Sequence, residues 1–277
     1  MPDGESFDLN AIEAAFERRE FFLKYQPIVS LQDGRCLGAE ALIRWKRPDG
    51  STLDASGFMP ATDRTPLSGI LTYWVIDTVA AELNDWLDAH PEGNIAINIP
   101  PEILGRGGLD YAAKKSGLRA RSGQLILEIT ERGVPDQQGL DALNRVPETG
   151  ARIALDDTTL SGTNLALLMR CHFDFVTVDH LLVQQIGSEA GQRRPAWLDG
   201  LAALLGTTSL QIVAEGIESS VQGEVLKNAG VQWGQGHLLS PPLSLDAFMQ
   251  YYEQVSRARH VDAPTPPATK SSEPGRR

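Results

Sequence analysis

The chain carries at residues 152–157 the stretch Arg-Ile-Ala-Leu-Asp-Asp, in which an apolar run ends on two acids. One parity of this run is aliphatic, with Ile153 and Leu155, while the other holds Ala154 and Asp156. Because successive side chains of a strand point to opposite faces, the aliphatic parity fits contact with covering helices and the other parity points inward. The stretch predicts a buried strand whose open end carries oxygen ligands.

The same pattern recurs along the chain, where further apolar runs close on an acid or an amide and a helical stretch follows nearly every one. The expected strands are 21–30, 36–45, 94–98, 125–131, 152–156, 173–179 and 209–215, with a weaker one near 231–235. If these strands are parallel and closed into a (β/α) barrel, their C-terminal ends share the rim where such barrels assemble active sites. The side chains expected at this rim are Glu40, Asn98, Glu128, Asp156, Asp179 and Glu215.

Alternation of strands and helices over most of the 277 residues predicts a single α/β barrel domain over 21–257. A helix is expected within 1–20 before it, and an aperiodic tail rich in Pro, Ser and charge over 258–277 is expected to be disordered. The turn Asp33-Gly34 predicts a hairpin, so at least one strand pairs antiparallel. The expected helices are 67–90 (as one helix or two), 109–116, 138–146, 164–169, 181–205, 219–228 and 245–257.

Composition excludes several classes of function. The net charge is −11 and no Lys or Arg cluster is dense, which argues against a polymeric nucleic acid partner. No stretch is apolar and long enough to insert into a membrane, and no signal segment opens the chain, so a cytoplasmic protein is expected. Cys36 and Cys171 have no neighbour at a metal or redox spacing, and we expect buried thiols.

The rim predicts a metal site. Carboxylates and amides are hard oxygen donors that suit Mg²⁺ or Mn²⁺. Adjacent acids such as Asp156 and Asp157 can flank two ions a few Å apart, an arrangement typical of phosphoester hydrolysis. A single acid at a strand end, such as Asp179 or Glu131, is more often a helix N-cap or an ion-pair partner. Several acids close together repel one another unless cations intervene, which favours metal binding.

Several segments together resemble the EAL-domain family of cyclic di-GMP phosphodiesterases, in order and spacing, from Phe21 to Phe248. The matching segments are Tyr25–Val29, Glu40–Trp45, Leu127–Glu131, Ala154–Asp157, Ala214–Glu218 and Gln235-Gly236. The resemblance implies a modified (β/α)₈ barrel of the TIM type with one antiparallel strand. It also implies hydrolysis of cyclic di-GMP to linear pGpG with two divalent ions, Mg²⁺ or Mn²⁺, which would neutralise the phosphate and activate water.

The resemblance also assigns roles to individual residues. One ion would be held by Glu40, Asn98, Glu128 and Asp156, and a second with the help of Asp156 and Asp157. Glu215 would support the attacking water, Gln235 would lie near the reacting centre, and Glu131 would anchor the loop after the two acids. The nucleotide would contact Gln26, Asp179 and Arg44, whose guanidinium suits phosphate.

Two departures from the family pattern bear on activity. Thr177 stands where the family has a Lys that orients water and offsets charge, and such a loss costs about a hundred-fold to ten-thousand-fold in rate. Residues 156–162 read Asp-Asp-Thr-Thr-Leu-Ser-Gly in place of Asp-Asp-Phe-Gly-Thr-Gly, a loop that shapes the second metal site and the family's homodimer interface. Smaller changes are Pro100 for Ser and Asp63 for Glu.

Three functions therefore stay open from the sequence. The chain is a phosphodiesterase of reduced activity, a receptor that binds cyclic di-GMP without cleaving it, or a module that binds a protein partner and needs neither nucleotide nor metal. The second rests on Thr177 and on the altered loop after Asp157. The full acid set argues against the third, because it would then have no role.

Overall fold

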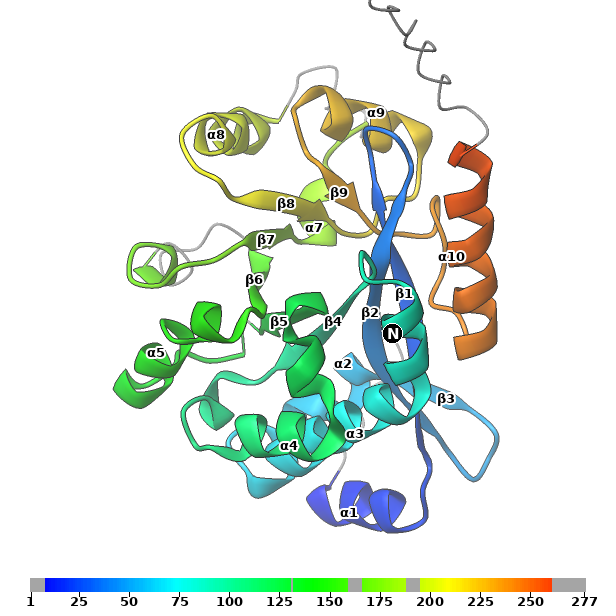
Figure 1. Ribbon diagram of the computed structural model, residues 1–277, viewed down its shortest axis with the longest axis vertical. Helices are drawn as coiled ribbons and strands as arrows, with labels where there is room; N and C mark the ends of the chain where they lie inside the picture. Colours follow the sequence, from blue (N-terminus) through cyan, green and yellow to red (C-terminus); the bar gives the residue numbers. More distant parts are fainter. Residues whose placement is uncertain (1–7, 131, 159–165, 188–194, 261–277) are drawn as a thin grey trace, which may run out of the picture.

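The computed structural model describes residues 8–130, 132–158, 166–187 and 195–260. Eight strands form a ring in the order β1, β9, β8, β7, β6, β5, β4, β2, and the pairing of β1 with β2 closes it (Figure 1). Strand β1 runs antiparallel to both neighbours, and the other strands of the ring are parallel. The predicted modified (β/α)₈ barrel with one antiparallel strand is thereby confirmed.

The strands lie close to their predicted positions. They are β1 (Phe21–Ser30), β2 (Cys36–Lys46), β3 (Thr52–Asp54), β4 (Asn94–Ile99), β5 (Leu125–Ile129), β6 (Arg152–Thr158), β7 (Phe175–Val178), β8 (Gln211–Ala214) and β9 (Trp233–Gly234). Strand β3 pairs antiparallel with the end of β2, outside the ring. The long β1–β2 hairpin follows the predicted turn at Asp33-Gly34.

Helices cover the ring from outside (Figure 1). They are α1 (Leu9–Glu17), α2 (Ala55–Phe58), α3 (Pro66–Ala89), α4 (Gly108–Ser116), α5 (Gln137–Leu143), α7 (His180–Val183), α8 (Ala196–Leu205), α9 (Ser220–Asn228) and α10 (Leu245–His260). Short 3₁₀ helices are η1 (Met59–Thr62), η2 (Pro101–Ile103), η3 (Leu118–Gln124) and η4 (Val146–Thr149). No helix in the described ranges has both the length and the apolar content needed to cross a bilayer.

The predicted helix over 67–90 is one unbroken helix, α3. Its N-terminus is set by Thr65, whose hydroxyl accepts a hydrogen bond from the Leu67 amide, and by Pro66 at the first helical position. Helix α9 begins with a capping box between Ser219 and Gln222. Local sequence therefore determines where these helices begin.

The single helix predicted over 181–205 is wrong. Helix α7 ends at Val183, and Gly187 lies at a φ of +82°, a left-handed conformation that ends helical geometry. Helix α8 begins only at Ala196, directly after Pro195. Gly187 follows the first of the two helices that the prediction joined, and Pro195 directly precedes the second.

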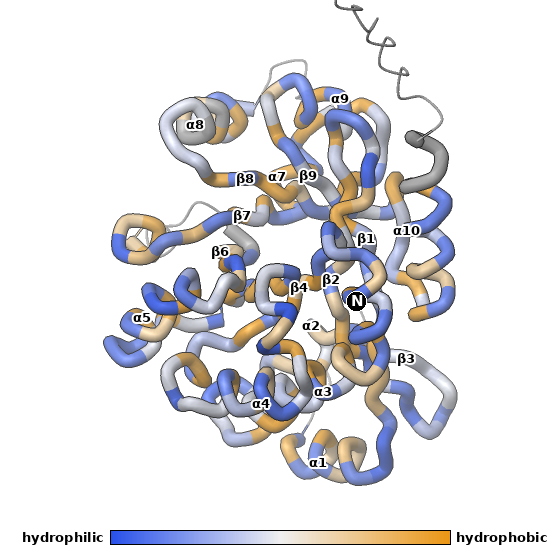
Figure 2. The backbone as a smooth tube through the Cα atoms, viewed as in Figure 1, coloured by the Kyte–Doolittle hydropathy of each residue, from blue (hydrophilic) through white to orange (hydrophobic). Residues whose placement is uncertain are grey.

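The predicted parity of the strands is confirmed in the packing. Ile153 and Leu155 belong to the core between the ring and its helices, and Val176 and Val178 pack in a second outer cluster. Inside the ring lie the small or inward-pointing side chains Ile28, Ala96, Ile126, Ala154, Phe175 and Val213. Figure 2 shows hydrophobic segments along the strands and mixed segments around the helices. This inner layer is apolar, and the polar side chains of the predicted rim lie toward the end of the ring where the parallel strands finish, called here the upper end.

The ends of the chain extend this picture. Ile12 and Ala15 of α1 are fully buried in the same core as the ring, so the N-terminal helix packs as part of the barrel domain. Helix α10 reaches His260, and the rest of the expected tail lies outside the described residues. Cys36 and Cys171 are buried free thiols, as expected from their spacing.

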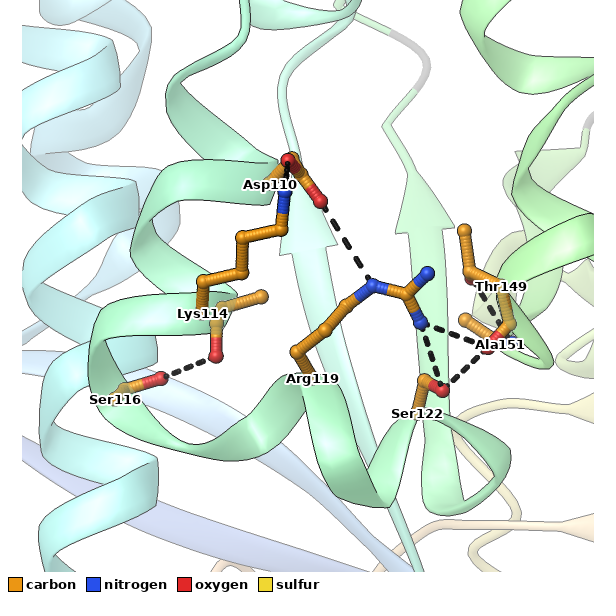
Figure 3. A network of polar contacts seen from close by, with 8 residues as sticks. Asp110, Lys114, Ser116, Arg119, Ser122, Thr149 and Ala151 are labelled. Carbon is orange, nitrogen blue, oxygen red and sulfur yellow. Dashed lines mark hydrogen bonds and ion pairs between the residues drawn. The ribbon is translucent and has the colours of Figure 1, made fainter.

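A surface network ties together the elements that precede β5 and β6, at the end of the ring where these strands begin (Figure 3). Asp110 on α4 accepts a 2.6 Å hydrogen bond from Lys114 and lies 3.8 Å from the guanidinium of Arg119. Arg119 Nη1 donates to the Thr149 carbonyl at 3.0 Å and to Ser122 Oγ at 3.4 Å. The network joins α4, η3 and η4 through opposite charges in contact with solvent.

Candidate functional site

The side chains of Glu40, Asn98 and Gln235 form a hydrogen-bonded group in the upper part of the ring. Asn98 Nδ2 donates to Glu40 Oε1 at 2.6 Å, and Gln235 Nε2 donates to Glu40 Oε2 at 2.8 Å. Glu40 does not close its strand as expected; it lies in the middle of β2, opposite Ala96 of β4. Strand β2 continues past Glu40 and pairs with β3 outside the ring. The acid therefore does not mark the end of this strand.

Backbone geometry fixes Gln235 in this group. Its amide donates to the Ala214 carbonyl at 2.9 Å, and Ile217 donates to the Gln235 carbonyl at 3.1 Å. The next residue, Gly236, has a φ of +150°, and a Cβ there would stand 2.2 Å from the Ile217 nitrogen. A glycine is required at this crossing, so the Gln235-Gly236 pair is a structural unit.

Glu128 lies against Glu40 inside the ring. Glu128 is only 3% exposed and hydrogen-bonds directly to Glu40. Burial raises the pKa of Glu128 well above its usual range, and the negative charges of nearby acids raise it further; these acids are Glu40, Asp156 and Glu215. Burial also raises the pKa of Glu40, although the hydrogen bonds from Asn98 and Gln235 oppose the shift. Burial and mutual repulsion therefore disfavour negative charge on both carboxyl groups at once.

Asp156 and Glu215 complete the acidic group. Asp156 follows the ladder between β5 and β6, and its Oδ1 accepts a 2.9 Å hydrogen bond from the hydroxyl of Thr177. Glu215 follows β8, and its amide donates to the Val178 carbonyl. Thr177 is fully buried. The residue that stands in place of the family's lysine therefore contacts Asp156, a predicted metal ligand, inside the ring.

Six of the predicted site residues line one cavity of about 340 Å³, a volume within the range of small-ligand sites. They are Gln26, Glu40, Asn98, Asp156, Glu215 and Gln235. Other wall residues come from β2, α2, η1 and α3 and from the segments after β4 and β5, and those of α3 include the apolar side chains Leu71 and Val75. The cavity therefore has an acidic floor in the barrel and an apolar side under α3.

The donor set fits a hard divalent cation in kind, because it consists of carboxylate and amide oxygens. Within the described ranges, no three acidic, imidazole or thiol groups are gathered around one point as a ready ligand set. Both Glu40 oxygens accept hydrogen bonds from amides, and Glu40 also hydrogen-bonds to Glu128. A cation bound here would relieve the repulsion between the acids.

Other predicted residues lie apart from the cavity wall. Arg44 shares the strand face of Glu40, but its Nε is 2.7 Å from Asp54 Oδ1. Asp179 caps α7, because its Oδ1 accepts from the Leu181 amide at 2.6 Å and lies 2.9 Å from His180 Nδ1. The N-cap alternative considered for Asp179 is thus its contact in the structure.

The side chain of Asp157, residue Glu131 and most of the loop after Asp157 lie outside the described residues.

Sequence reasoning missed two residues on the cavity wall, Thr130 and Arg132. Thr130 is 4% exposed, and its hydroxyl has no hydrogen-bond partner among the described residues. Thr130 falls within the strand predicted over 125–131 and has the parity of Glu128, whereas Arg132 follows that strand. Alternation could therefore have pointed to Thr130, but no local pattern pointed to Arg132.

Comparison with known proteins identifies the family. The EAL domain model matches residues 9–242. The chain belongs to the EAL domain family. It is 34% identical over 246 residues to the probable cyclic di-GMP phosphodiesterase PdeB of Escherichia coli K12, which covers 88% of this chain and 46% of that protein. The chain thus spans about half the length of this relative.

Solved structures of the family share the fold. The EAL chain resembles the phosphodiesterase PaMucR in complex with c-di-GMP, with a TM-score of 0.77 and 30% identity over 86% of this chain and 98% of that one. It also resembles the EAL enzyme Bd1971 in its cAMP and cyclic-di-GMP bound form, with a TM-score of 0.77 and 27% identity over 88% of this chain and 67% of that one.

Proposed function

We propose that this EAL domain is a divalent-metal-dependent phosphodiesterase of reduced activity that hydrolyses cyclic di-GMP to linear pGpG. The names of its relatives support the reaction class. The observation that carries the proposal is the buried contact between Glu40 and Glu128, because Glu40 also lines a cavity of small-ligand size together with Asn98 and Asp156. Buried like charges are costly, and a site that binds cations is the physical reason to retain them.

In this proposal, Glu40, Asn98, Glu128 and Asp156 hold one divalent cation, and Asp157 helps to hold a second. Bound cations supply charge neutralisation at the phosphate and a lowered pKa of water. Glu215, on the cavity wall, would accept a proton from the attacking water as the water oxygen bonds to phosphorus. The 3′ oxygen would leave as its bond to phosphorus breaks and would take up a proton from solvent. Glu131 anchors the neighbouring loop.

The amides and the arginine position the substrate. Gln235 donates to Glu40 and keeps its own carbonyl oxygen without a partner among the described residues, so this oxygen can accept from substrate or water. Gln26 lines the same cavity and can donate to the nucleotide. Arg44 reaches phosphate only by sharing or leaving its contact with Asp54. Asp179 contributes indirectly, because it caps α7 and so fixes the start of that helix.

Thr177 is the reason we propose reduced activity. Its hydroxyl donates to Asp156 Oδ1 at 2.9 Å and thereby uses an oxygen assigned to a cation. It also brings no positive charge to the transition state. The loss of one such electrostatic group costs about a hundred-fold or more in rate, while the other residues still bind substrate.

The same contact favours a second candidate function, a receptor that binds cyclic di-GMP without cleaving it. A receptor needs the cavity and the nucleotide contacts but not a group that orients water. Its structural support is that Thr177, at the position of the family's lysine, is fully buried and hydrogen-bonded to Asp156.

One experiment separates these functions. Purified protein is incubated with cyclic di-GMP and Mg²⁺ or Mn²⁺, pGpG is followed by chromatography, and binding is measured by calorimetry in parallel. Glu128→Gln serves as the control, since it keeps the shape and removes the charge. Formation of pGpG above this control supports the enzyme. Binding without pGpG supports the receptor, and the absence of both rejects the two proposals.

A further inference from the structure

Arg132 stands out because of the charge balance of the cavity. Among the described residues that line it, Glu40, Asp156 and Glu215 are acidic, and Arg132 is the one Lys, Arg or His. A phosphodiester that enters such an acidic cavity is repelled unless positive charge meets it. Arg44, on the strand face of Glu40, does not line the cavity and already pairs with Asp54.

The geometry of Arg132 leaves its guanidinium available. Its side chain is 20% exposed, and its contact with an acid among the described residues is one long ion pair, Nη1 to Asp63 Oδ1 at 3.5 Å. A guanidinium carries five N–H donors in a planar fork that matches two oxygens of a phosphate. Asp63 therefore orients the guanidinium at the wall while most of its donors remain free for a ligand.

Thr130 provides a second, independent observation at the same wall. Its hydroxyl lines the cavity, is buried, and has no hydrogen-bond partner in the described part of the chain. A buried polar group without a partner costs free energy, so such a group in a cavity wall marks a position where a ligand or water completes the hydrogen bond. Thr130 and Arg132 both line the cavity, directly after the end of β5.

We infer that Arg132, with Thr130 beside it, is a substrate-binding subsite that holds a phosphodiester oxygen of the nucleotide and supplies positive charge to a cavity that lacks a lysine at position 177. This inference rests on the proposed function, since it names how the same cavity binds its substrate. A cyclic dinucleotide carries two phosphodiesters, and the subsite contacts an oxygen of one of them. Arg132 is a binding residue and moves no proton.

The test measures binding and hydrolysis of cyclic di-GMP in wild-type protein, Arg132→Gln and Arg132→Lys, at several salt concentrations. Loss of a charge-assisted hydrogen bond is expected to raise Kd by about ten-fold to hundred-fold in Arg132→Gln. The salt dependence of its Kd should also become weaker, because one cation fewer meets the phosphate. Arg132→Lys keeps the charge but loses the fork, so an increase of about three-fold to ten-fold is expected.

The matched control is Arg170→Gln, which removes the same charge at an exposed position outside the cavity and should bind as wild type does. Wild-type protein that neither binds nor cleaves the nucleotide rejects the proposed function. Wild-type binding with an Arg132→Gln Kd within two-fold of it overturns only the subsite. Thermal unfolding checks the fold of each variant. If Arg132→Gln does not fold, Arg132→Lys decides, and an unchanged Kd in that variant rejects the inference.

Discussion

The two ends of the barrel treat charge in opposite ways. At the end where β5 and β6 begin, Asp110, Lys114 and Arg119 pair as opposite charges in contact with solvent (Figure 3). At the other end, called here the mouth, lie the acids of the cavity, Glu40, Asp156 and Glu215, together with Glu128. Glu40 and Glu128 are buried against each other, and burial and nearby acids raise the pKa of Glu128 well above its usual range. In the first arrangement each charge has an opposite charge beside it. In the second, the negative charges need a bound proton or cation to neutralise them.

This difference separates a structural region from a functional one. Exposed opposite charges contribute little individually, about 0 to 1 kcal/mol, so the surface network can vary without consequence for chemistry. Buried like charges lower the stability of the fold, and a sequence keeps them where a ligand neutralises them. The mouth should therefore respond to metal and to charge substitutions, and the opposite end should not.

Removal of charge at the mouth should give the largest effect. We expect Glu128→Gln to lower hydrolysis by about a hundred-fold or more, because a ligand charge is lost. Its thermal midpoint should equal or exceed that of metal-free wild type, because glutamine resembles the protonated acid. Chromatography of pGpG and calorimetric unfolding measure the two quantities. A thermal midpoint well below that of metal-free wild type would show that Glu128 is an ordinary core residue, and the contrast between the two ends would then fail.

Restoring positive charge should act in the opposite direction. Thr177→Lys is expected to raise hydrolysis by about ten-fold or more if ligands and substrate are already positioned. Initial rates of pGpG formation measure it. Thr177→Val is the matched control, since it removes the hydrogen bond to Asp156 and adds no charge. An unchanged rate in the lysine variant would place the deficiency in the loop after Asp157.

Metal should stabilise the mouth without substrate. At a Mn²⁺ concentration about 100 times its Kd, binding to the folded state contributes about 2.7 kcal/mol. For a domain of this size that corresponds to a rise in Tm of about 5 to 10 °C. Scanning calorimetry with and without EDTA measures the shift, and Glu128→Gln should show a smaller one. Equal shifts in both proteins would mean that the ion binds elsewhere.

The smallest effect is expected at the opposite end. Arg119→Ala removes hydrogen bonds to Ser122 and the Thr149 carbonyl and the long ion pair with Asp110. We expect a loss of about 1 kcal/mol in the free energy of unfolding and no change in hydrolysis. Urea unfolding and the pGpG assay test this. A large loss of activity would show that the two ends are coupled, contrary to the comparison.

The sequence by itself determined the strands, their inward parity and the family, because alternation and short motifs are local properties of the chain. It located Asn98, Glu128 and Asp156 on inward positions. It placed Glu40 at the end of an apolar run, although Glu40 lies in the middle of β2, and it joined α7 to α8 across Gly187 and Pro195.

Only the tertiary structure decided which of these side chains meet. Three contacts each join residues from different strands or loops: the hydrogen bond between Glu40 and Glu128, the pairing of Arg44 with Asp54, and the hydrogen bond of Thr177 to Asp156. Such contacts depend on register and strand tilt around the closed ring, which no local pattern encodes. Whether a carboxylate is a solvated surface charge or one member of a buried pair follows from that closure, and so does its chemistry.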